Sequence, residues 1–373
     1  MGFMFPLALL AAFATEEESM ISVGEHVEIH SEILGEDRKL AIGLPYGYET
    51  SEAEYPVLVV LNCGSPTALA HAVSTMEILD GKSQAPQMIV VGIDDGNGVR
   101  DYFPQPLEGR PGSGHAEAFL QFILMEVIPF VEQEYRASSC RVLYGASNAG
   151  MFTVYAMLTE TGSFSGYIAA SPSLAWFSDY FNQAVSCFDP DDGTRFYMNW
   201  GSDDIQSIVL NATPELSLLF SGVFAERGSY SFEKIESGGH VPYLSLHNGL
   251  RFVFQSFALD DSLLFAGGLD GLVQHYGNLS VEFGYAVNVP SGKFMSLGQK
   301  YLREGSSSLA LEVFLAYRES YPRSSMAWFL TGETYRTLAD TASAAECYRY
   351  ALDLNPGLAI AGERLQALSE GGV

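Results

Sequence analysis

The sequence is short of cysteine and of basic residues, and each shortage excludes something. Its 373 residues include four cysteines, too few and too scattered for a disulfide framework, and none has the spacing of a metal site. We therefore expect no metal and no cofactor. Lysine and arginine total 19 against 45 acidic residues, a net charge of −26. Such a surface repels polyanions, so nucleic acid is excluded as a partner.

Long hydrophobic runs are also scarce. The apolar run at residues 1–14 is too short to cross a bilayer, so no membrane span is expected. It ends in Ala12-Phe13-Ala14, the small-x-small pattern of a signal-peptidase site, and acidic residues follow it. Because the run has no basic residue, a buried N-terminal strand is the alternative. We predict a signal peptide over 1–14 and a periplasmic or secreted protein.

What the sequence does contain is material for a large core, with 47% hydrophobic and 13% aromatic residues. Its first patterned segments, 27–33 and 38–44, alternate in polarity and predict an antiparallel hairpin. Strands alternating with helical periodicity then predict an α/β fold with a mostly parallel sheet. The further predicted strands are 57–61, 88–93, 142–144, 166–170, 195–200 and 231–236, and the longest predicted helix is 115–135.

The C-terminal part of the chain shows an internal repeat. Residues 294–322 match the chain 34 positions later, with Gly298 paired to Gly332 and Phe314 to Tyr348. This period predicts two tetratricopeptide-like repeats over 291–370 in a small all-α tail, after an α/β domain over 22–262 and a connecting segment over 263–290. Two repeats are fewer than an independent array needs, so we expect them to dock on the first domain and to offer a surface to a protein partner.

Residues 141–150, Arg-Val-Leu-Tyr-Gly-Ala-Ser-Asn-Ala-Gly, carry the strongest functional signal. An apolar strand runs into Gly145, Ser147 follows, and an apolar helix continues over 151–158. This is the pattern of a nucleophile elbow, in which a strained turn holds a serine hydroxyl at the sheet edge. Ala149 stands where the G-x-S-x-G pattern has its second glycine. The alternative is an ordinary serine in a buried turn, and we predict the nucleophile.

A serine nucleophile needs a histidine that takes its proton. In α/β-hydrolases the histidine comes last in the chain order, which leaves His240, His247 and His275. His240 lies in a glycine-rich loop directly after the predicted strand 231–236. That position places it at the same sheet edge as Ser147, so we predict His240 as the general base.

The histidine in turn needs a carboxylate that orients it. The predicted strand 195–200 ends in Gly201 and Ser202, and two aspartates follow, Asp203 and Asp204. Sequence spacing cannot separate neighbouring residues whose side chains point apart. We choose Asp204, and Asp203 stays the alternative.

The reaction also needs two backbone N–H groups that stabilise a developing oxyanion. One should come from Asn148, the residue after the nucleophile. The other should come from the loop after strand 57–61, which points to Cys63, with Gly64 next in line. A reactive thiol at Cys63 is the alternative, but no Cys/His/Asn pattern surrounds it.

Taken together, these motifs resemble the putative-esterase family of α/β-hydrolases, which includes siderophore, feruloyl and acetylxylan esterases and S-formylglutathione hydrolase. The resemblance covers about residues 22–258, and some members carry a tetratricopeptide-like tail. The chain departs from the family at Ala149 in the elbow and at Cys63, where a glycine is usual. The landmarks are Ile33-Leu34-Gly35-Glu36-Asp37-Arg38, Leu44-Pro45-Tyr46-Gly47-Tyr48, Arg100-Asp101-Tyr102, the segment 141–150, Ser171-Pro172-Ser173-Leu174-Ala175-Trp176 and Gly239-His240.

The resemblance implies a serine carboxylic-ester hydrolase that acts on an aryl or acetyl ester of a carbohydrate, or on a catecholate siderophore. Arg100 is the expected local positive charge for the substrate, and Trp176 an expected aromatic wall, with core packing as its alternative. The acidic domain favours neutral esters over polyanionic siderophores. A second hypothesis has the same fold but little catalytic activity: the protein is a catalytically weak α/β-hydrolase scaffold whose repeats bind a protein partner.

Overall fold

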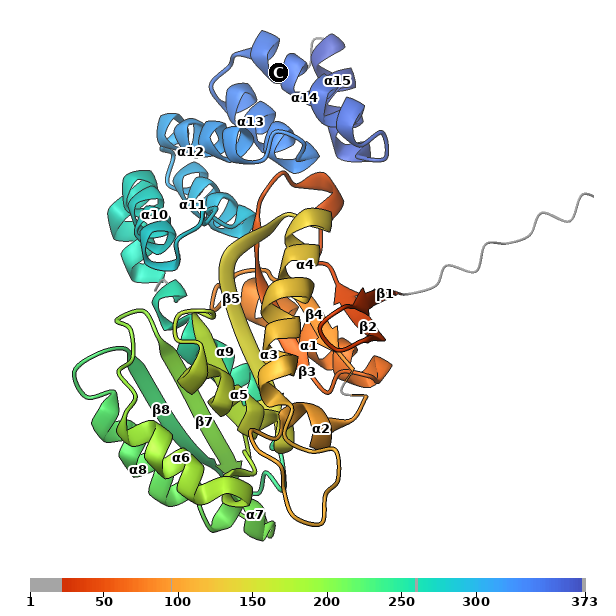
Figure 1. Ribbon diagram of the computed structural model, residues 1–373. Helices are drawn as coiled ribbons and strands as arrows, with labels where there is room; N and C mark the ends of the chain where they lie inside the picture. The colour runs from red at the N-terminus through yellow and green to blue at the C-terminus, as the bar shows by residue number, and fades with distance from the viewer. Residues whose placement is uncertain (1–21, 95, 259–260, 371–373) are drawn as a thin grey trace, which may run out of the picture.

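The computed structural model describes residues 22–94, 96–258 and 261–370, so the predicted signal peptide lies outside the described residues. An eight-stranded sheet of order β1-β2-β4-β3-β5-β6-β7-β8 forms the centre of the α/β region (Figure 1). β2 pairs antiparallel with β1 and β4, and all other neighbours run parallel. The strands are β1 (Glu25–Ser31), β2 (Glu36–Gly43), β3 (Tyr55–Leu61), β4 (Ile89–Ile93), β5 (Ala137–Ala146), β6 (Gly166–Ala170), β7 (Arg195–Gly201) and β8 (Ser229–Ile235).

Helices cover both faces of this sheet, as expected of a parallel sheet whose central strands are apolar throughout. Every residue of β3, β4 and β6 is buried. One face packs against α3 to α6 and α8, and the other against α1 and α9. These helices are α1 (Pro66–Gly81), α2 (Gly98–Tyr102), α3 (Ala116–Phe122), α4 (Ile128–Glu134), α5 (Asn148–Thr159), α6 (Ser178–Ser186), α7 (Ser207–Leu210), α8 (Thr213–Val223) and α9 (Ser245–Val253).

The helix predicted over 115–135 forms, but with a change of hydrogen-bond pattern in the middle. A π-helical turn over Ile123–Val127 separates α3 from α4. Pro129 has no N–H to donate to the carbonyl four residues before it, and the N–H of Ile128 donates to Ile123, five residues back. Three short 3-10 helices complete this region: Tyr48–Thr50, Leu174–Phe177 and Gln255–Phe257.

Over residues 261–370, as far as the structure describes them, six helices form an all-helical region after the sheet (Figure 1). Within it, Gly298 lies so close to Phe314 that an added Cβ would be 2.4 Å from the ring, and a Cβ added at Gly332 would be 2.8 Å from the Tyr348 ring. The two contacts are 34 residues apart, which matches the predicted period. Their assignment to tetratricopeptide repeats stays a prediction. The helices are α10 (Asp261–Phe283), α11 (Ser291–Arg303), α12 (Ser307–Ser320), α13 (Ser325–Thr337), α14 (Thr341–Leu354) and α15 (Ala359–Ser369).

The helical region packs against the α/β region through α10. The ring of Phe283 lies 5.2 Å from that of Phe254, and Arg195 stacks on Phe283 while its guanidinium pairs with Glu282 at 2.7 Å. Residues 263–290, predicted as a connecting segment, thus contain most of a helix that is broken at Gly268, where φ is 58°. Among the described helices, none combines the length and apolarity that a bilayer crossing requires.

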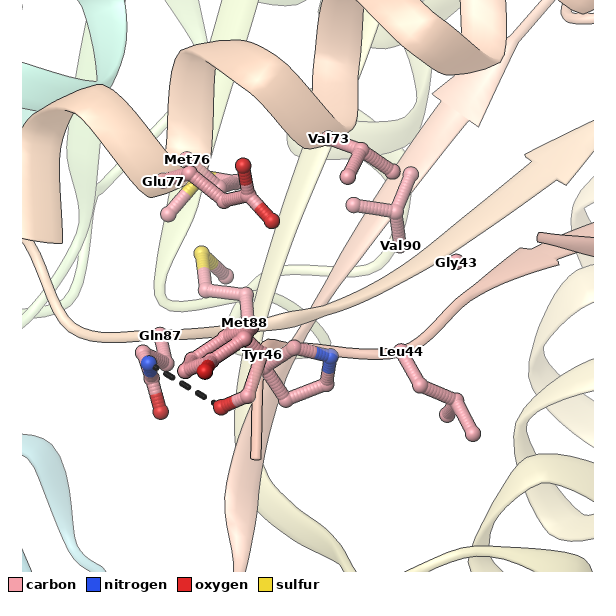
Figure 2. A pocket seen from close by; sticks show the side chains of 10 residues that line it. Gly43, Leu44, Tyr46, Val73, Met76, Glu77, Gln87, Met88 and Val90 are labelled. Carbon is pink, nitrogen blue, oxygen red and sulfur yellow. Dashed lines mark hydrogen bonds between the residues drawn. The ribbon is translucent and has the colours of Figure 1, made fainter. Parts of the chain in front are cut away.

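A small pocket lies between α1 and strands β2 and β4 (Figure 2). Val73, Met76, Met88 and Val90 line it, and Tyr46 closes one side, its carbonyl accepting a hydrogen bond from Gln87 at 3.4 Å. Its volume is about 10 Å³, which leaves room for about one water molecule. The exposed Tyr46 and Glu77 also line it, so the pocket is a shallow depression of the surface that is too small for a ligand.

Candidate active site

The turn between β5 and α5 holds Ser147 in a strained backbone conformation. Its φ is 56° and its ψ −117°, a region that residues other than glycine rarely adopt. Gly145 is required there, because a Cβ would lie 2.2 Å from the Ala149 carbonyl oxygen. Ala149 itself is buried in the core, and Gly150 provides the close approach to β6 instead. The missing glycine at position 149 therefore leaves the strand–turn–helix geometry intact.

The structure brings together the three residues that the sequence proposed for the reaction. The Nε2 atom of His240 lies 3.1 Å from the Ser147 hydroxyl, and its Nδ1 atom lies 2.9 Å from the Asp204 carboxylate. The Asp204 side chain is fully buried, whereas that of His240 is 31% exposed. A hydroxyl, an imidazole and a buried carboxylate thus form one chain of hydrogen bonds that opens to solvent at the histidine.

The neighbouring Asp203 has a different contact. Its carboxylate accepts a hydrogen bond from the Gly239 N–H at 2.7 Å, so it fixes the loop that carries His240. Asp204 also accepts a hydrogen bond from the N–H of Gln206 at 2.8 Å. Adjacent side chains point apart, as expected at the end of a strand, and only Asp204 contacts the imidazole.

Two further serines, which the sequence reasoning missed, lie beside this chain of hydrogen bonds. The Ser173 hydroxyl is 3.2 Å from that of Ser147, and the Ser171 hydroxyl accepts a hydrogen bond from the N–H of Val241. Both serines are fully buried. The segment after β6 could have signalled them, because it ends at the same sheet edge as the elbow.

Backbone strain is concentrated around the site. Four residues other than glycine have φ between 41° and 59° at or beside the hydrogen bonds of the site: Asn62, Ser147, Ser171 and Val241. Each such residue costs free energy that the surrounding structure must supply. Strain gathered at one sheet edge is typical of a pre-organised functional site.

The expected oxyanion donor Cys63 requires a correction. Its N–H donates to the Ile93 carbonyl at 3.0 Å, so it cannot also bind an oxyanion. The preceding N–H, that of Asn62, donates to the Tyr102 hydroxyl at 3.2 Å. Burial and the nearby Asp94 carboxylate raise the pKa of the Cys63 thiol to about 11, which argues against a reactive thiolate. Asn148, at the first position of α5, keeps its expected place.

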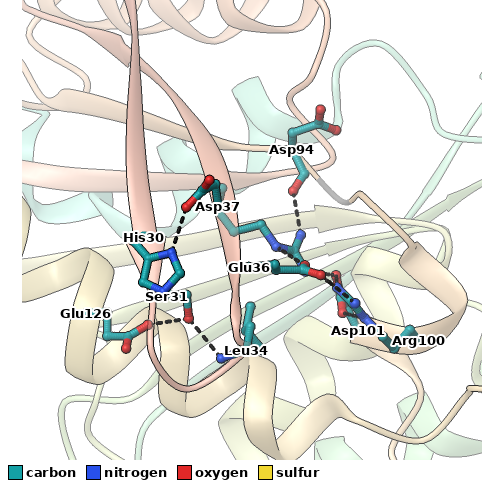
Figure 3. A network of polar contacts seen from close by, with 10 residues as sticks. His30, Ser31, Leu34, Glu36, Asp37, Asp94, Arg100, Asp101 and Glu126 are labelled. Atoms are coloured by element: carbon teal, nitrogen blue, oxygen red, sulfur yellow. Dashed lines mark hydrogen bonds and ion pairs between the residues drawn. The ribbon is translucent and has the colours of Figure 1, made fainter.

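The expected substrate cation Arg100 also requires a correction. Its guanidinium donates two hydrogen bonds to Glu36, at 2.6 and 2.9 Å, and two to Asp101, at 2.7 and 3.4 Å (Figure 3). Arg38 joins the same network through Asp101, at 2.6 Å. These contacts raise the pKa of Arg100 and lower that of Glu36. The charge of Arg100 is therefore compensated within the protein and holds β2 to α2.

Trp176 follows Ser173 along the edge of the site and is half-buried. Its ring packs on Phe103, with centroids 5.9 Å apart, and the exposed Arg110 lies over the ring at 5.9 Å. The indole Nε1 is buried without a hydrogen-bond partner among the described residues. The Trp176 side chain is thus partly packed against the core and partly exposed to solvent. Its contact with a substrate stays a prediction.

The chain is similar to known esterases. Residues 31–209 match the family model described as putative esterase. The chain is 37% identical over 76 residues to the ferri-bacillibactin esterase BesA of Bacillus subtilis, a match covering 20% of this chain and 26% of that protein. It is 44% identical over 80 residues to a siderophore enterobactin esterase of Emericella nidulans, covering 19% and 26%. The chain thus spans only about a quarter of the length of these relatives.

Solved structures resemble the chain over a longer stretch. The IroE-like serine hydrolase of Shewanella oneidensis aligns with a TM-score of 0.68 at 25% identity, over 79% of this chain and 99% of that one. The siderophore hydrolase EstA of Aspergillus nidulans aligns with a TM-score of 0.54 at 19% identity, over 69% and 100%, and shows the shared fold. Fold, family model and relatives point the same way: residues 31–209 match the putative-esterase family, and the α/β region has the fold of the α/β-hydrolases.

Proposed function

We propose that this protein is a serine carboxylic-ester hydrolase that acts outside the cytoplasm, with Ser147 as nucleophile. The observation that carries the proposal is the continuous chain of hydrogen bonds from the Ser147 hydroxyl through His240 to Asp204. Nucleophile, base and orienting carboxylate at these distances are the requirements of acyl transfer through an acyl-enzyme. The match of residues 31–209 to the putative-esterase model supports the same reaction.

In the proposed mechanism, His240 removes the proton of Ser147 as the hydroxyl attacks the ester carbonyl. Asp204 holds the imidazole in the tautomer that presents Nε2 to the serine, and it stabilises the imidazolium that forms. The imidazolium then donates its proton to the leaving alkoxide. A water molecule, deprotonated by the same histidine, attacks the acyl-enzyme and releases the acid, which restores Ser147.

The oxyanion of the tetrahedral intermediate needs two donors. Asn148 supplies one, because the first N–H groups of a helix have no intrahelical acceptor. For the second donor we propose Gly64, whose N–H makes no hydrogen bond to the described residues. Gly64 follows Cys63 in the same loop. Its N–H would take the role first expected of the Cys63 N–H, which donates to the Ile93 carbonyl instead.

The charges around the site support a neutral ester as the substrate. Arg100 is paired with two carboxylates, so it offers little attraction to an anionic ester. Asp94 packs against Gly64, where an added Cβ would lie 2.6 Å from its carboxylate oxygen. A carboxylate beside the oxyanion loop repels anionic substrates. Rates on ethyl ferulate and on enterobactin test this preference, and a strong preference for enterobactin would reverse it.

The primary experiment compares wild type with Ser147→Ala on p-nitrophenyl acetate. We expect the substitution to abolish turnover and to prevent labelling by a fluorophosphonate probe, while the melting temperature stays similar. Equal hydrolysis by both proteins would refute the proposal. Absence of probe labelling in the wild type would instead favour the second candidate, an inactive scaffold that presents its helical region to a protein partner. The motivation for this candidate is that Cys63 stands where a glycine is usual in the oxyanion loop.

A further inference from the structure

A cavity of about 630 Å³ lies between the α/β region and the helical region. Its walls include Tyr55 at the start of β3, residues 85–87 before β4, and residues of α10 and α12. Tyr55 pairs with Ala137, the first residue of β5, whereas Ser147 follows the last residue of β5. The cavity therefore lies at the edge of the sheet opposite the candidate active site, the end that the helical region covers in Figure 1. Its volume is typical of small-molecule sites.

Tyrosine dominates the apolar part of this cavity. Six tyrosines line it: Tyr46 is exposed, Tyr321 is half-buried, and the other four are buried. The Tyr321 hydroxyl donates to the Val289 carbonyl at 2.8 Å, and the Tyr317 hydroxyl bonds to that of Ser324 at 3.2 Å. Because these hydroxyls already have partners, the two residues offer a ligand mainly their rings. Tyrosine rings attract cations through their electron-rich faces.

Asp80, in the last turn of α1, also lines the cavity. Its carboxylate has no ion-pair partner among the described residues. Tyr276 and Tyr321 lie near it, Gln87 hydrogen-bonds to it, and Glu77 of the same helix is the other nearby acid. The Asp80 side chain is half-buried. Removing a carboxylate from water without a cation beside it costs free energy, and a positively charged ligand would lower that cost.

The other charged groups of the cavity do not neutralise the Asp80 carboxylate. Glu54 adds a second carboxylate to its lining. Arg323 is the single cation among the lining residues, but its side chain is 58% exposed and 4.0 Å from Glu52. The cavity therefore combines aromatic rings with an excess of one negative charge, which favours cations over anions.

We propose that this cavity is a second ligand site, which binds a small organic compound through an ammonium group. The ammonium pairs with the Asp80 carboxylate, and the tyrosine rings surround the rest of the ligand. The serines and asparagines of the lining, among them Ser83 and Asn288, provide hydrogen bonds for its polar groups. This site is independent of the proposed esterase activity, since none of its residues belongs to the candidate active site.

The test is calorimetric titration of the full-length protein at neutral pH with phenethylamine, glucosamine and spermidine. The neutral counterparts 2-phenylethanol and glucose serve as comparisons. We expect at least one amine to bind, with a Kd at least about tenfold below that of its neutral counterpart where there is one. Asp80→Asn should raise that Kd about tenfold or more, and Glu77→Gln, which removes a charge from the exposed side of α1, should leave it within about twofold.

Arg323→Ala provides a second variant with the opposite expected sign. Removal of this cation from the rim should lower the Kd of the amine a few-fold. The proposal is overturned if no amine binds up to about 5 mM, if neutral and cationic compounds bind alike, or if Asp80→Asn binds as the wild type does. Thermal unfolding of each variant verifies its fold, and hydrolysis of p-nitrophenyl acetate by Asp80→Asn should equal that of the wild type.

Discussion

At the scale of single residues, the two aspartates after β7 show how neighbouring identical side chains acquire different tasks. Asp204 contacts the imidazole of His240, whereas Asp203 holds the backbone of Gly239. Chain order alone predicts that one of them orients the histidine. The direction of each side chain, which the end of the strand determines, decides which one it is.

This difference predicts unequal effects of two isosteric substitutions. Asp204→Asn should lower kcat on p-nitrophenyl acetate by about 10³-fold or more, because the amide favours the wrong tautomer of His240. Asp203→Asn should lower kcat only about tenfold, because a neutral oxygen can still accept the hydrogen bond from Gly239. Steady-state kinetics measure both, and a larger loss for Asp203→Asn would exchange the two roles.

Asp80 predicts a pH-dependent stability. Burial raises the pKa of Asp80 from 3.8 to about 6, so between these values the folded protein holds a proton that the unfolded chain has released. Its contribution to stability is therefore lost as pH rises through that window. Asp80→Asn should raise the free energy of unfolding by on the order of 2 kcal/mol at neutral pH and change it little near pH 4.

Urea unfolding of wild type and Asp80→Asn at several pH values measures this effect, with Glu77→Gln as the control on the same helix. A destabilised Asp80→Asn at neutral pH would contradict the assignment of an uncompensated carboxylate. A residue that lowers the stability of the free protein is expected at a ligand site, because binding sites often keep groups that are unfavourable for folding.

At the scale of elements, the sequence predicts strands well where burial on both faces produces a continuous apolar run. β6 has the limits expected from its pattern, 166–170. β5 is longer than its apolar part, because Ser138 and Cys140 are small enough to be buried while they read as polar or neutral. The ion pairs of Arg100 were not predictable, since Glu36 lies 64 residues away in the sequence. The hydrogen bond from the Cys63 N–H to Ile93 was not predictable either, because it depends on the register between β3 and β4.

The elbow predicts the result of restoring its usual glycine. Ala149→Gly should lower the free energy of unfolding by about 0.5–1 kcal/mol, because it removes a buried methyl group and frees the first turn of α5. Since Gly150 already provides the close approach to β6, kcat should stay within about threefold of the wild type. Urea unfolding and steady-state kinetics test this, and a large gain in kcat would mean that the methyl group obstructs the turn.

The helical hairpin of α11 and α12 predicts opposite effects for two glycines of one helix. Gly298→Ala should destabilise the protein by about 1–3 kcal/mol, because the new Cβ would lie 2.4 Å from the Phe314 ring. Gly292→Ala, which meets nothing within 4 Å, should instead stabilise by up to about 1 kcal/mol. Denaturant unfolding measures both, and equal effects would contradict the close packing of α11 on α12.

At the scale of the whole molecule, the net charge of −26 and the paired state of Arg100 act in the same direction on the substrate. Two aryl acetates separate this effect from chemistry: the neutral methyl 4-acetoxybenzoate and the anionic 4-acetoxybenzoate, whose para carboxylate cannot reach its own ester carbonyl. We expect kcat/KM for the anionic ester to be the lower one at low ionic strength. It should rise several-fold between about 0.02 and 0.5 M salt, because screening shortens the range of the repulsion from about 20 to 4 Å.

The neutral ester is the internal control, and its kcat/KM should stay constant over the same range of salt. Asp94→Asn distinguishes the local charge beside Gly64 from the field of the whole surface. If the local carboxylate dominates, this variant accepts the anionic ester at low salt, and the salt dependence shrinks with it. If the whole surface dominates, the variant retains the salt dependence of the wild type. A salt-independent preference for the anionic ester would contradict both, and would point to a cation near Ser147. The exposed Arg110, which lies over the Trp176 ring, would then be the residue to replace.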